Sequence, residues 1–343
     1  VTGNQEFPAY ASLALQQSNF VGGNSVITNS NPNLRWEQTT TQGVGVDFSM
    51  FNGRLNGTVD YFNKSTQDLL FLISYPQPAA SADRWVNLPG NVVNKGWEFG
   101  LDYQLVRPAY RGAFGWDVNY NMSFLNNNVE GFGSTVVNTG EVSGQGLSGA
   151  YAQTIRDGSP LFTFVMPTFL RFDAFGNGVY ANGAKDELQG SALPKFNAGL
   201  TNNFSYKKFT ASFFFNAVTG FVVYNNTANA LLLKGSLKNA KNVTRDVVNS
   251  IENSINPGNV STRFLEKGDY IRFANASISY AVDVKQGSFI KGLNISLSGQ
   301  NLGLFTKYSG LDPEVNVDKS RNGVPSRGFD YTATPRARVF TLG

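Results

Sequence analysis

Apolar and polar residues alternate along much of the chain, which is the pattern of a β-strand with two different faces. Clear examples are residues 97–105 and 114–124, where an aromatic or aliphatic side chain occupies almost every second position. The same pattern predicts a hairpin over 44–61, with Asn52-Gly53 as its turn, and another over 196–217. A third hairpin pairs 270–280 with 293–299, and a last strand begins at Arg338. We estimate about ten to twelve strands.

The two faces of these strands favour a membrane barrel over a soluble sheet. Large aromatic residues crowd the apolar face near the strand ends, as they do in the girdles of outer-membrane barrels. The opposite face carries Asp, Glu, Asn and Gln even in mid-strand, which suits a wet interior. Soluble sandwiches and barrels also alternate, with the apolar face inward, and they remain the alternative at this point.

The predicted connections are alternately short and long. Asn52-Gly53, Pro108–Gly112 and Lys207-Lys208 are short turns, whereas long loops span 68–93, 126–159, 173–193, 222–267 and 308–335. Outer-membrane barrels have short periplasmic turns and long extracellular loops. The pattern therefore predicts the orientation as well, with the long loops outside. Helix signals are few, and residues 231–255 are the one amphipathic candidate.

Composition agrees with this interpretation and lowers the chance of catalysis. Charged residues are 15% of the 343 residues and aromatic residues 13%, while soluble domains average roughly 25% charged residues. The chain has no Cys and no His, which excludes thiol chemistry, thiolate metal sites and the commonest general base. We therefore expect no enzyme and no catalytic residues. The net charge of +4 is spread out, so no nucleic-acid partner is expected.

Several segments resemble the SusC/RagA family of TonB-linked outer-membrane transporters, in the family's order. Residues 31–37 (NPNLRWE) resemble its NPDLKWE segment, 60–70 (DYFNKSTQDLL) its DYYNKKTKDLL, and 94–98 (NKGWE) its NKGFE. Residues 268–273 (GDYIRF) are similar to GDYIRLRN, and 299–314 contain GQNL and TKYSGLDPE. Residues 335–342 resemble the start of the family's last strand. The departures lie mainly in the long loops.

This resemblance implies a fold, a cellular location and partners. The fold would be all-β, a transmembrane antiparallel β-barrel in the outer membrane of a Gram-negative bacterium of the Bacteroidota type. The chain would be a single domain over 1–343, the C-terminal portion of a large plugged barrel of about 22 strands. It would supply roughly half of them, with the plug and N-terminal region outside it. The function implied is active import of a glycan or peptide, with a SusD-like surface lipoprotein and the TonB–ExbB–ExbD machinery as partners.

Three groups of residues are candidate sites. Asp47, Asp60, Glu98, Asp102 and Asp117 fall on the polar face, where they could line a substrate path or form a solvated wall beside the plug. The loop aromatics Trp85, Tyr151, Phe175, Tyr180 and Tyr224 could contact a substrate or a partner, or pack within the loops. Asp173, Asn177 and Asp186 form an oxygen-rich loop that could bind calcium, although turn chemistry explains it better. No other cofactor or metal site is expected.

Two further functions stay open on sequence alone. One is a barrel that acts as a structural or interaction subunit of a larger outer-membrane complex, without transport. The other is a soluble carbohydrate-binding β-protein.

Overall fold

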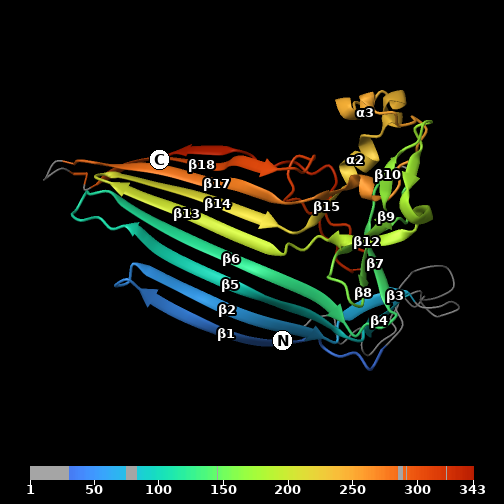
Figure 1. The fold of residues 1–343 in the computed structure, drawn as a ribbon, viewed down its shortest axis with the longest axis horizontal. Helices are drawn as coiled ribbons and strands as arrows, with labels where there is room; N and C mark the ends of the chain where they lie inside the picture. Colours follow the sequence, from blue (N-terminus) through green and yellow to red (C-terminus); the bar gives the residue numbers. More distant parts are fainter. Residues whose placement is uncertain (1–30, 75–82, 145, 285–288, 291, 322) are drawn as a thin grey trace, which may run out of the picture.

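The computed structural model describes residues 31–74, 83–144, 146–284, 289–290, 292–321 and 323–343. Its main feature is one curved antiparallel sheet of nine strands, in which each strand pairs with its neighbours in chain order. Figure 1 shows the strands side by side as a single wall. They are β1 (Gln38–Met50), β2 (Leu55–Gln67), β5 (Asn91–Val106), β6 (Gly115–Glu130), β13 (Phe196–Tyr206), β14 (Phe209–Thr219), β17 (Tyr270–Val282), β18 (Leu293–Thr306) and β20 (Val339–Leu342).

The strand register sorts the side chains into an apolar and a polar face, because residues opposite one another in a sheet share a face. One row across the sheet consists of Val46, Val59, Phe99, Met122, Ala198, Ala217, Ile271 and Phe305. The next row lies on the other face and consists of Asp47, Thr58, Gly100, Asn121, Gly199, Asn216, Arg272 and Leu304. The alternation in the sequence is thus a real division of faces.

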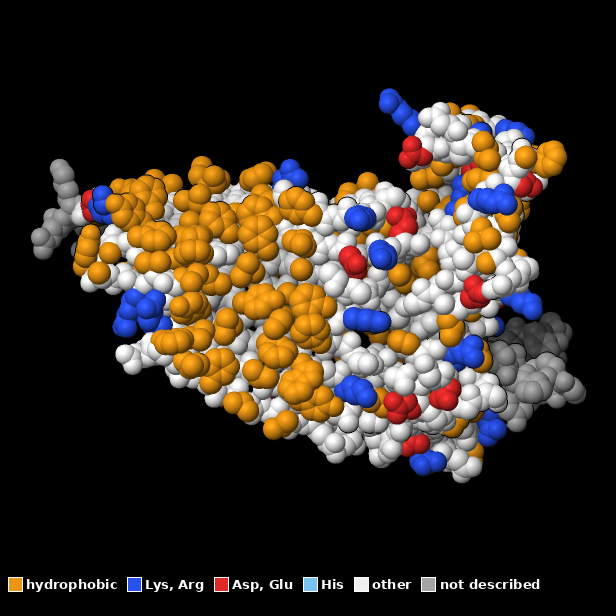
Figure 2. Space-filling view, in the orientation of Figure 1, with side chains coloured by type: hydrophobic (Ala, Val, Ile, Leu, Met, Phe, Trp, Pro, Cys, Tyr) orange, Lys and Arg blue, Asp and Glu red, His pale blue; other side chains and the backbone are white. Residues whose placement is uncertain are grey.

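The apolar face is open rather than packed against another layer. Val44 is 68% exposed and Trp97 47%, and Figure 2 shows hydrophobic side chains covering the strands while charges gather beyond them. Aromatic rows border this face, Tyr61, Trp97, Phe124 and Phe196 toward the long loops and Tyr206, Phe209 and Tyr280 toward the short turns. From Phe196 to Tyr206 the strand rises about 33 Å, or about 25 Å at the usual tilt, which matches the apolar band of outer-membrane barrels.

Short and long connections alternate as predicted, but the loops predicted at 126–159 and 173–193 belong to one connection rather than two. Short turns occupy 51–54, 107–114 and 207–208, whereas 68–90, 131–195, 220–269 and 307–338 are the long connections. In Figure 1 the long connections gather at one end of the wall. A soluble sandwich would need a second sheet over the apolar face, and the described residues place none there. Among these residues no helix has the length and apolar character required to cross a membrane.

The long connections fold together into a loop assembly with its own secondary structure. A four-stranded sheet has the order β12-β9-β8-β7, and a three-stranded sheet has the order β16-β15-β19. Two further pairs, β3-β4 and β10-β11, form two-stranded sheets. The strands of these four sheets are β3 (Leu70–Ser74), β4 (Asp83–Asn87), β7 (Val136–Glu141), β8 (Tyr151–Arg156), β9 (Thr163–Pro167), β10 (Phe169–Phe172), β11 (Gly178–Tyr180), β12 (Asp186–Ser191), β15 (Val222–Asn225), β16 (Leu265–Lys267) and β19 (Phe329–Asp330). The main buried core lies here, around Phe164, Tyr224 and Phe329.

Three sequence-based expectations differ from the structure. The main sheet has nine strands in the described residues rather than ten to twelve. At Leu105 the register shifts, so Val106 and not Leu105 pairs with Trp116 on the apolar face. The continuous helix over 231–255 was a wrong prediction. Short helical turns stand in and beside it, namely α2 (Asn226–Leu231), η2 (Lys234–Asn239), α3 (Arg245–Asn249) and η3 (Thr262–Phe264), and another, η1 (Ala181–Ala184), lies earlier in the chain. Asn and Ser in this segment bond to nearby backbone, which interrupts helices.

Candidate functional site

The polar face of the wall carries a chain of hydrogen bonds that runs across four strands. Asn119 on β6 donates its amide to Asp102 on β5, and Asn203 on β13 donates to Asn119 over 3.0 Å. Ser212 on β14 then donates to Asn203 over 2.8 Å. Amide and hydroxyl groups held in this way form a fixed, hydrophilic surface.

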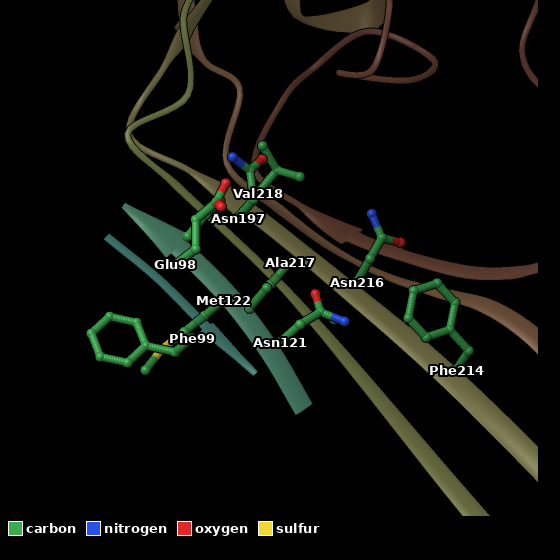
Figure 3. Close-up of a pocket in the computed structure, with 12 residues that line it drawn as sticks. Glu98, Phe99, Asn121, Met122, Asn197, Phe214, Asn216, Ala217 and Val218 are labelled. Atoms are coloured by element: carbon green, nitrogen blue, oxygen red, sulfur yellow. The ribbon is translucent and has the colours of Figure 1, made fainter. Parts of the chain in front are cut away.

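Nearer the long loops, the same face is hollowed into a cavity of about 400 Å³. Figure 3 shows that Glu98, Asn121, Asn197 and Asn216 present their polar groups on one side of the strands, whereas Phe99 and Met122 point to the other. Gly199 leaves room at the centre, because a Cβ there would lie 2.9 Å from the Asn121 side-chain oxygen and 3.1 Å from Phe214. On the polar face its lining thus combines three amides and the Glu98 carboxylate with Ser123, Phe214 and Val218.

The five candidate carboxylates all lie on this polar face. Asp60 and Glu98 are direct cross-strand partners, and Asp102 belongs to the hydrogen-bonded chain described above. Asp47 and Asp117 stand on other rows of the sheet, opposite Thr58 and Asn203. The structure therefore distributes the carboxylates over the wall and brings only Asp60 and Glu98 together.

The sequence analysis did not identify a buried network of charged residues around Arg272. Arg272 projects from the polar face of β17, and its side chain is only 4% exposed. It forms an ion pair of 2.6 Å with Asp312 and one of 3.4 Å with Glu314, and it donates to Asn301 over 2.6 Å. Glu314 also binds Arg336 at 2.8 Å. An Arg at a polar-face position of an alternating strand was the available signal, but Asp312, which pairs with it, lies 40 residues away in the chain.

Comparisons with known proteins agree with a barrel wall of this kind. The family described as TonB dependent receptor-like, beta-barrel, matches residues 4–302. The chain belongs to this family. It is therefore part of an outer-membrane receptor barrel, in a family of transporters rather than enzymes.

Individual relatives are similar over the whole chain but are much longer. TonB-dependent receptor P3 of Formosa agariphila is 28% identical over 100% of this chain, which covers 38% of that protein. TonB-dependent receptor SusC of Bacteroides thetaiotaomicron is 27% identical over 91% of the chain, which covers 32% of it. The structure of the RagAB peptide transporter has a TM-score of 0.80 at 18% identity, over 97% of this chain and 38% of that one. The chain thus spans about two-fifths or less of these relatives.

In the receptor the loop aromatics are scattered rather than gathered. Phe175 is 80% exposed, while Tyr151 stacks under the Arg321 guanidinium, whose central carbon lies 4.3 Å from the ring centre. Tyr180 packs against Phe169 with ring centres 5.8 Å apart. Trp85 lines an apolar cavity of about 290 Å³ between the first long loop and residues 323–325. These four side chains come from different parts of the loop assembly and form no single stacking surface.

Tyr224 requires a correction as a contact candidate. It is fully buried and packs in a three-ring cluster with Phe164 and Phe329, and its hydroxyl accepts a 2.8 Å hydrogen bond from Asn229. Burial also raises the pKa of the Tyr224 phenol above its ordinary value. A side chain enclosed in this way serves as core of the loop assembly and cannot reach a solute.

The oxygen-rich loop has the geometry of a turn. The Asp173 carboxylate accepts hydrogen bonds from the backbone amides of Asn177 and Phe175, at 2.8 and 2.9 Å. These bonds hold the pKa of Asp173 below its ordinary value. Asp186 is exposed on β12, and the described residues contain no group of three acidic, His or Cys side chains placed for a metal. Calcium binding at Asp173, Asn177 and Asp186 stays an untested prediction.

A larger cavity of about 660 Å³ lies within the loop assembly. Arg263 and Phe264 of η3, Glu266 of β16 and the segment 309–311 line it, together with Asp330. Glu266 accepts from the backbone and hydroxyl of Ser309 at 2.7 and 2.6 Å. The loop cavity therefore carries fixed polar groups of its own, at the end of the wall where the long connections gather.

Proposed function

We propose that the full-length protein imports a bulky polar nutrient, a glycan or a peptide, across the outer membrane. The polar wall with its amide-lined cavity carries this proposal, because a barrel that served only as scaffold needs no hollowed hydrophilic face. SusC and the RagAB peptide transporter support the same function as relatives. The loop cavity, at the opposite end of the wall from the short turns, would receive the solute before it reaches the wall.

We further propose two partners for this activity. The similarity to SusC and to the RagAB peptide transporter, together with the SusC/RagA-like motifs of the sequence, supports a SusD-like lipoprotein at the long loops of this receptor. The family description names TonB, which supports the TonB–ExbB–ExbD machinery as the energy source. In the proposed mechanism the wall of this chain does no chemistry. It binds the solute by hydrogen bonds that are exchanged as the solute moves.

The test is solute depletion by cells that carry or lack the full-length protein. Cells receive a mixture of peptides from digested protein and oligosaccharides from digested polysaccharide, and mass spectrometry follows what disappears from the medium. We expect one class to disappear only in cells with the receptor, and a protonophore to stop the loss. If neither class is depleted, the alternative of a structural subunit without transport takes its place.

Substitutions at two neighbouring residues test whether the polar face of the wall contributes to solute depletion. Asn121 lies on the polar face and Met122 on the apolar face (Figure 3). Asn121→Leu removes an amide from the route and should lower the depletion rate. Met122→Leu conserves volume on the lipid side and should leave the rate unchanged. Equal rates for both variants would mean that the solute does not use this face.

A further inference from the structure

The last long connection is organised as a strap across the polar face of the wall. We give this name to residues 308–321 and 323–335, which follow β18 and precede β20. Unlike an ordinary surface loop, the strap contains many buried side chains, including Tyr308, Asp312, Val324, Phe329 and Asp330. Such burial indicates that the strap is attached to other parts of the protein along its length.

Its first anchor lies on β17. Asp312 and Glu314 of the strap both bind Arg272 on the polar face. Beside them, Val315 packs in a cluster with Tyr270 and Tyr308. Tyr308 donates a 2.8 Å hydrogen bond to Asp330, further along the strap. A buried Arg paired in this way strongly resists separation, because removing either partner would leave an uncompensated buried charge.

Its second anchor lies on the same face of the sheet, at β5 and β6, which β13 and β14 separate from β17. Val324 is 3% exposed and packs with Val92 of β5 and Val129 of β6, both at positions that alternate with the outward-facing residues of these strands. Thr139 on β7 donates a 2.8 Å hydrogen bond to the Val324 carbonyl. Gln153 on β8 donates to the carbonyl of Arg327 and accepts from its backbone amide.

The two anchors imply that the strap crosses the interior. In the sheet order, β13 and β14 lie between β6 and β17, so the strap passes over both of them. Asn197 of β13 and Val218 of β14 face Pro313 and Glu314 of the strap across a cavity of about 210 Å³. The chain between the anchors therefore narrows the polar side of the barrel at its long-loop end.

The strap also lines three of the cavities at that end. Gly323 and Val324 line the apolar cavity beside Trp85. Residues 309–311 and Asp330 line the loop cavity of about 660 Å³, and residues 313–316 line the one above Asn197. A single segment thus shapes the spaces that a solute meets before the wall.

We propose that the strap is the size-determining element of the receptor, and that Arg272 is the positioning residue that seats it. The proposal rests on the proposed import function for its physiological meaning, but the crossing itself can be measured without transport. Arg272 in the GDYIRF segment and Asp312 in the SGLDPE segment are the two halves of this attachment.

The experiment measures access to the wall beneath the strap. In the full-length protein, without other cysteines, Asn197→Cys places a thiol under Pro313 and Glu314. Cells are treated with a small maleimide or with one that carries a long polyethylene glycol chain. We expect the parent to react readily with the small reagent and slowly with the large one. Arg272→Met should accelerate the large reagent by about a hundredfold, the scale expected for loss of one partner of a buried pair.

Two variants make the result specific. Arg336→Met removes a second Arg from the same network, but its side chain is 56% exposed, so the slow reaction with the large reagent should persist. Arg272→Lys keeps the charge and should restore part of the barrier. Heat-modifiable migration in gels confirms that each barrel is folded. If Arg272→Met does not fold, Asp312→Asn replaces it.

The outcomes separate clearly. If the large reagent reacts as fast as the small one in the parent, the strap does not cover the wall and the proposal is overturned. If folded Arg272→Met keeps the parent's selectivity, Arg272 does not seat the strap. A selective barrier together with no solute depletion would leave the strap established while removing the import function.

Discussion

The wall and the loop assembly place their large apolar side chains in opposite environments. On the wall, Val44 is 68% exposed and Ile278 48% exposed, whereas Phe164 and Phe329 in the loop assembly are fully buried. The wall thus has its apolar side toward lipid and its hydrogen-bonding groups toward the interior. The loop assembly is built like a small water-soluble domain, with a core of its own.

The two regions also use polar groups differently. On the wall, Asn119 and Asn203 bond to one another in a row that remains partly exposed. In the loop assembly, Thr139 and Gln153 are fully buried and bond to backbone of the strap. Wall groups can therefore exchange partners with a solute, while loop groups fix the shape of the cavities. This difference implies that mutations in the two regions should fail in different ways.

The largest effect is expected in the loop core. Phe164→Ala removes a fully buried ring that packs against Phe329 and Tyr224, and it should cost about 3–5 kcal/mol of loop stability. Phe209→Ala is the matched change on the wall, where the ring is 52% exposed. Hydrogen exchange followed by mass spectrometry should show faster exchange in β7–β9 for Phe164→Ala only. Faster exchange throughout the wall strands in that variant would show that the two regions are not separable.

The second-largest effect is expected for charged substitutions in the wall. Leu200 and Thr201 are neighbours on β13 that face lipid and interior respectively. Leu200→Arg should destabilise the barrel by about 2–4 kcal/mol because it places a charge near the middle of the bilayer, and Thr201→Arg by about 1 kcal/mol or less. Urea titration of the full-length protein in lipid vesicles gives both values. Equal costs would contradict the assignment of the two faces.

These regions also differ in how far the sequence predicts them. The wall can be predicted because the contrast between lipid and water repeats at every second residue, so short windows such as 114–124 contain the whole signal. Asn202 is an exception, because the alternation of apolar and polar residues does not predict a polar side chain there. It lies on the apolar face, and its side-chain oxygen accepts a 3.2 Å hydrogen bond from the Trp116 indole, which gives the indole N–H a partner on the lipid side.

The loop assembly and the strap could not be predicted in the same way. Phe175 and Tyr224 are both aromatic residues of long loops, yet one is 80% exposed and the other fully buried. Their difference depends on contacts among several connections that are distant in the chain. Likewise, nothing local to Arg272 indicates Asp312 as its partner. Contacts of this kind have no period and are visible only in the folded arrangement.

The smallest expected effect is a dependence of loop-assembly stability on pH. Burial and the hydrogen bond to Asp330 raise the pKa of Tyr308 above its ordinary value of 10.0, and burial does the same for Tyr224. Below pH 10 both phenols are protonated in folded and unfolded chains, and their contribution to stability is complete. As the pH rises above 10, only the unfolded phenols ionise, so the loop assembly should lose stability.

Tyr308→Phe tests this within the strap. Loss of its hydrogen bond to the Asp330 carboxylate should cost about 1.5 kcal/mol at neutral pH, and the fall in stability above pH 10 should become shallower. Tyr110→Phe, at a ring that is 74% exposed in a short turn, should change neither quantity. Hydrogen exchange of strap amides, corrected for their intrinsic pH dependence, provides the measurement. If wall and strap lose protection together at high pH, ionisation disrupts the barrel as a whole, and the two regions unfold as one cooperative unit rather than two.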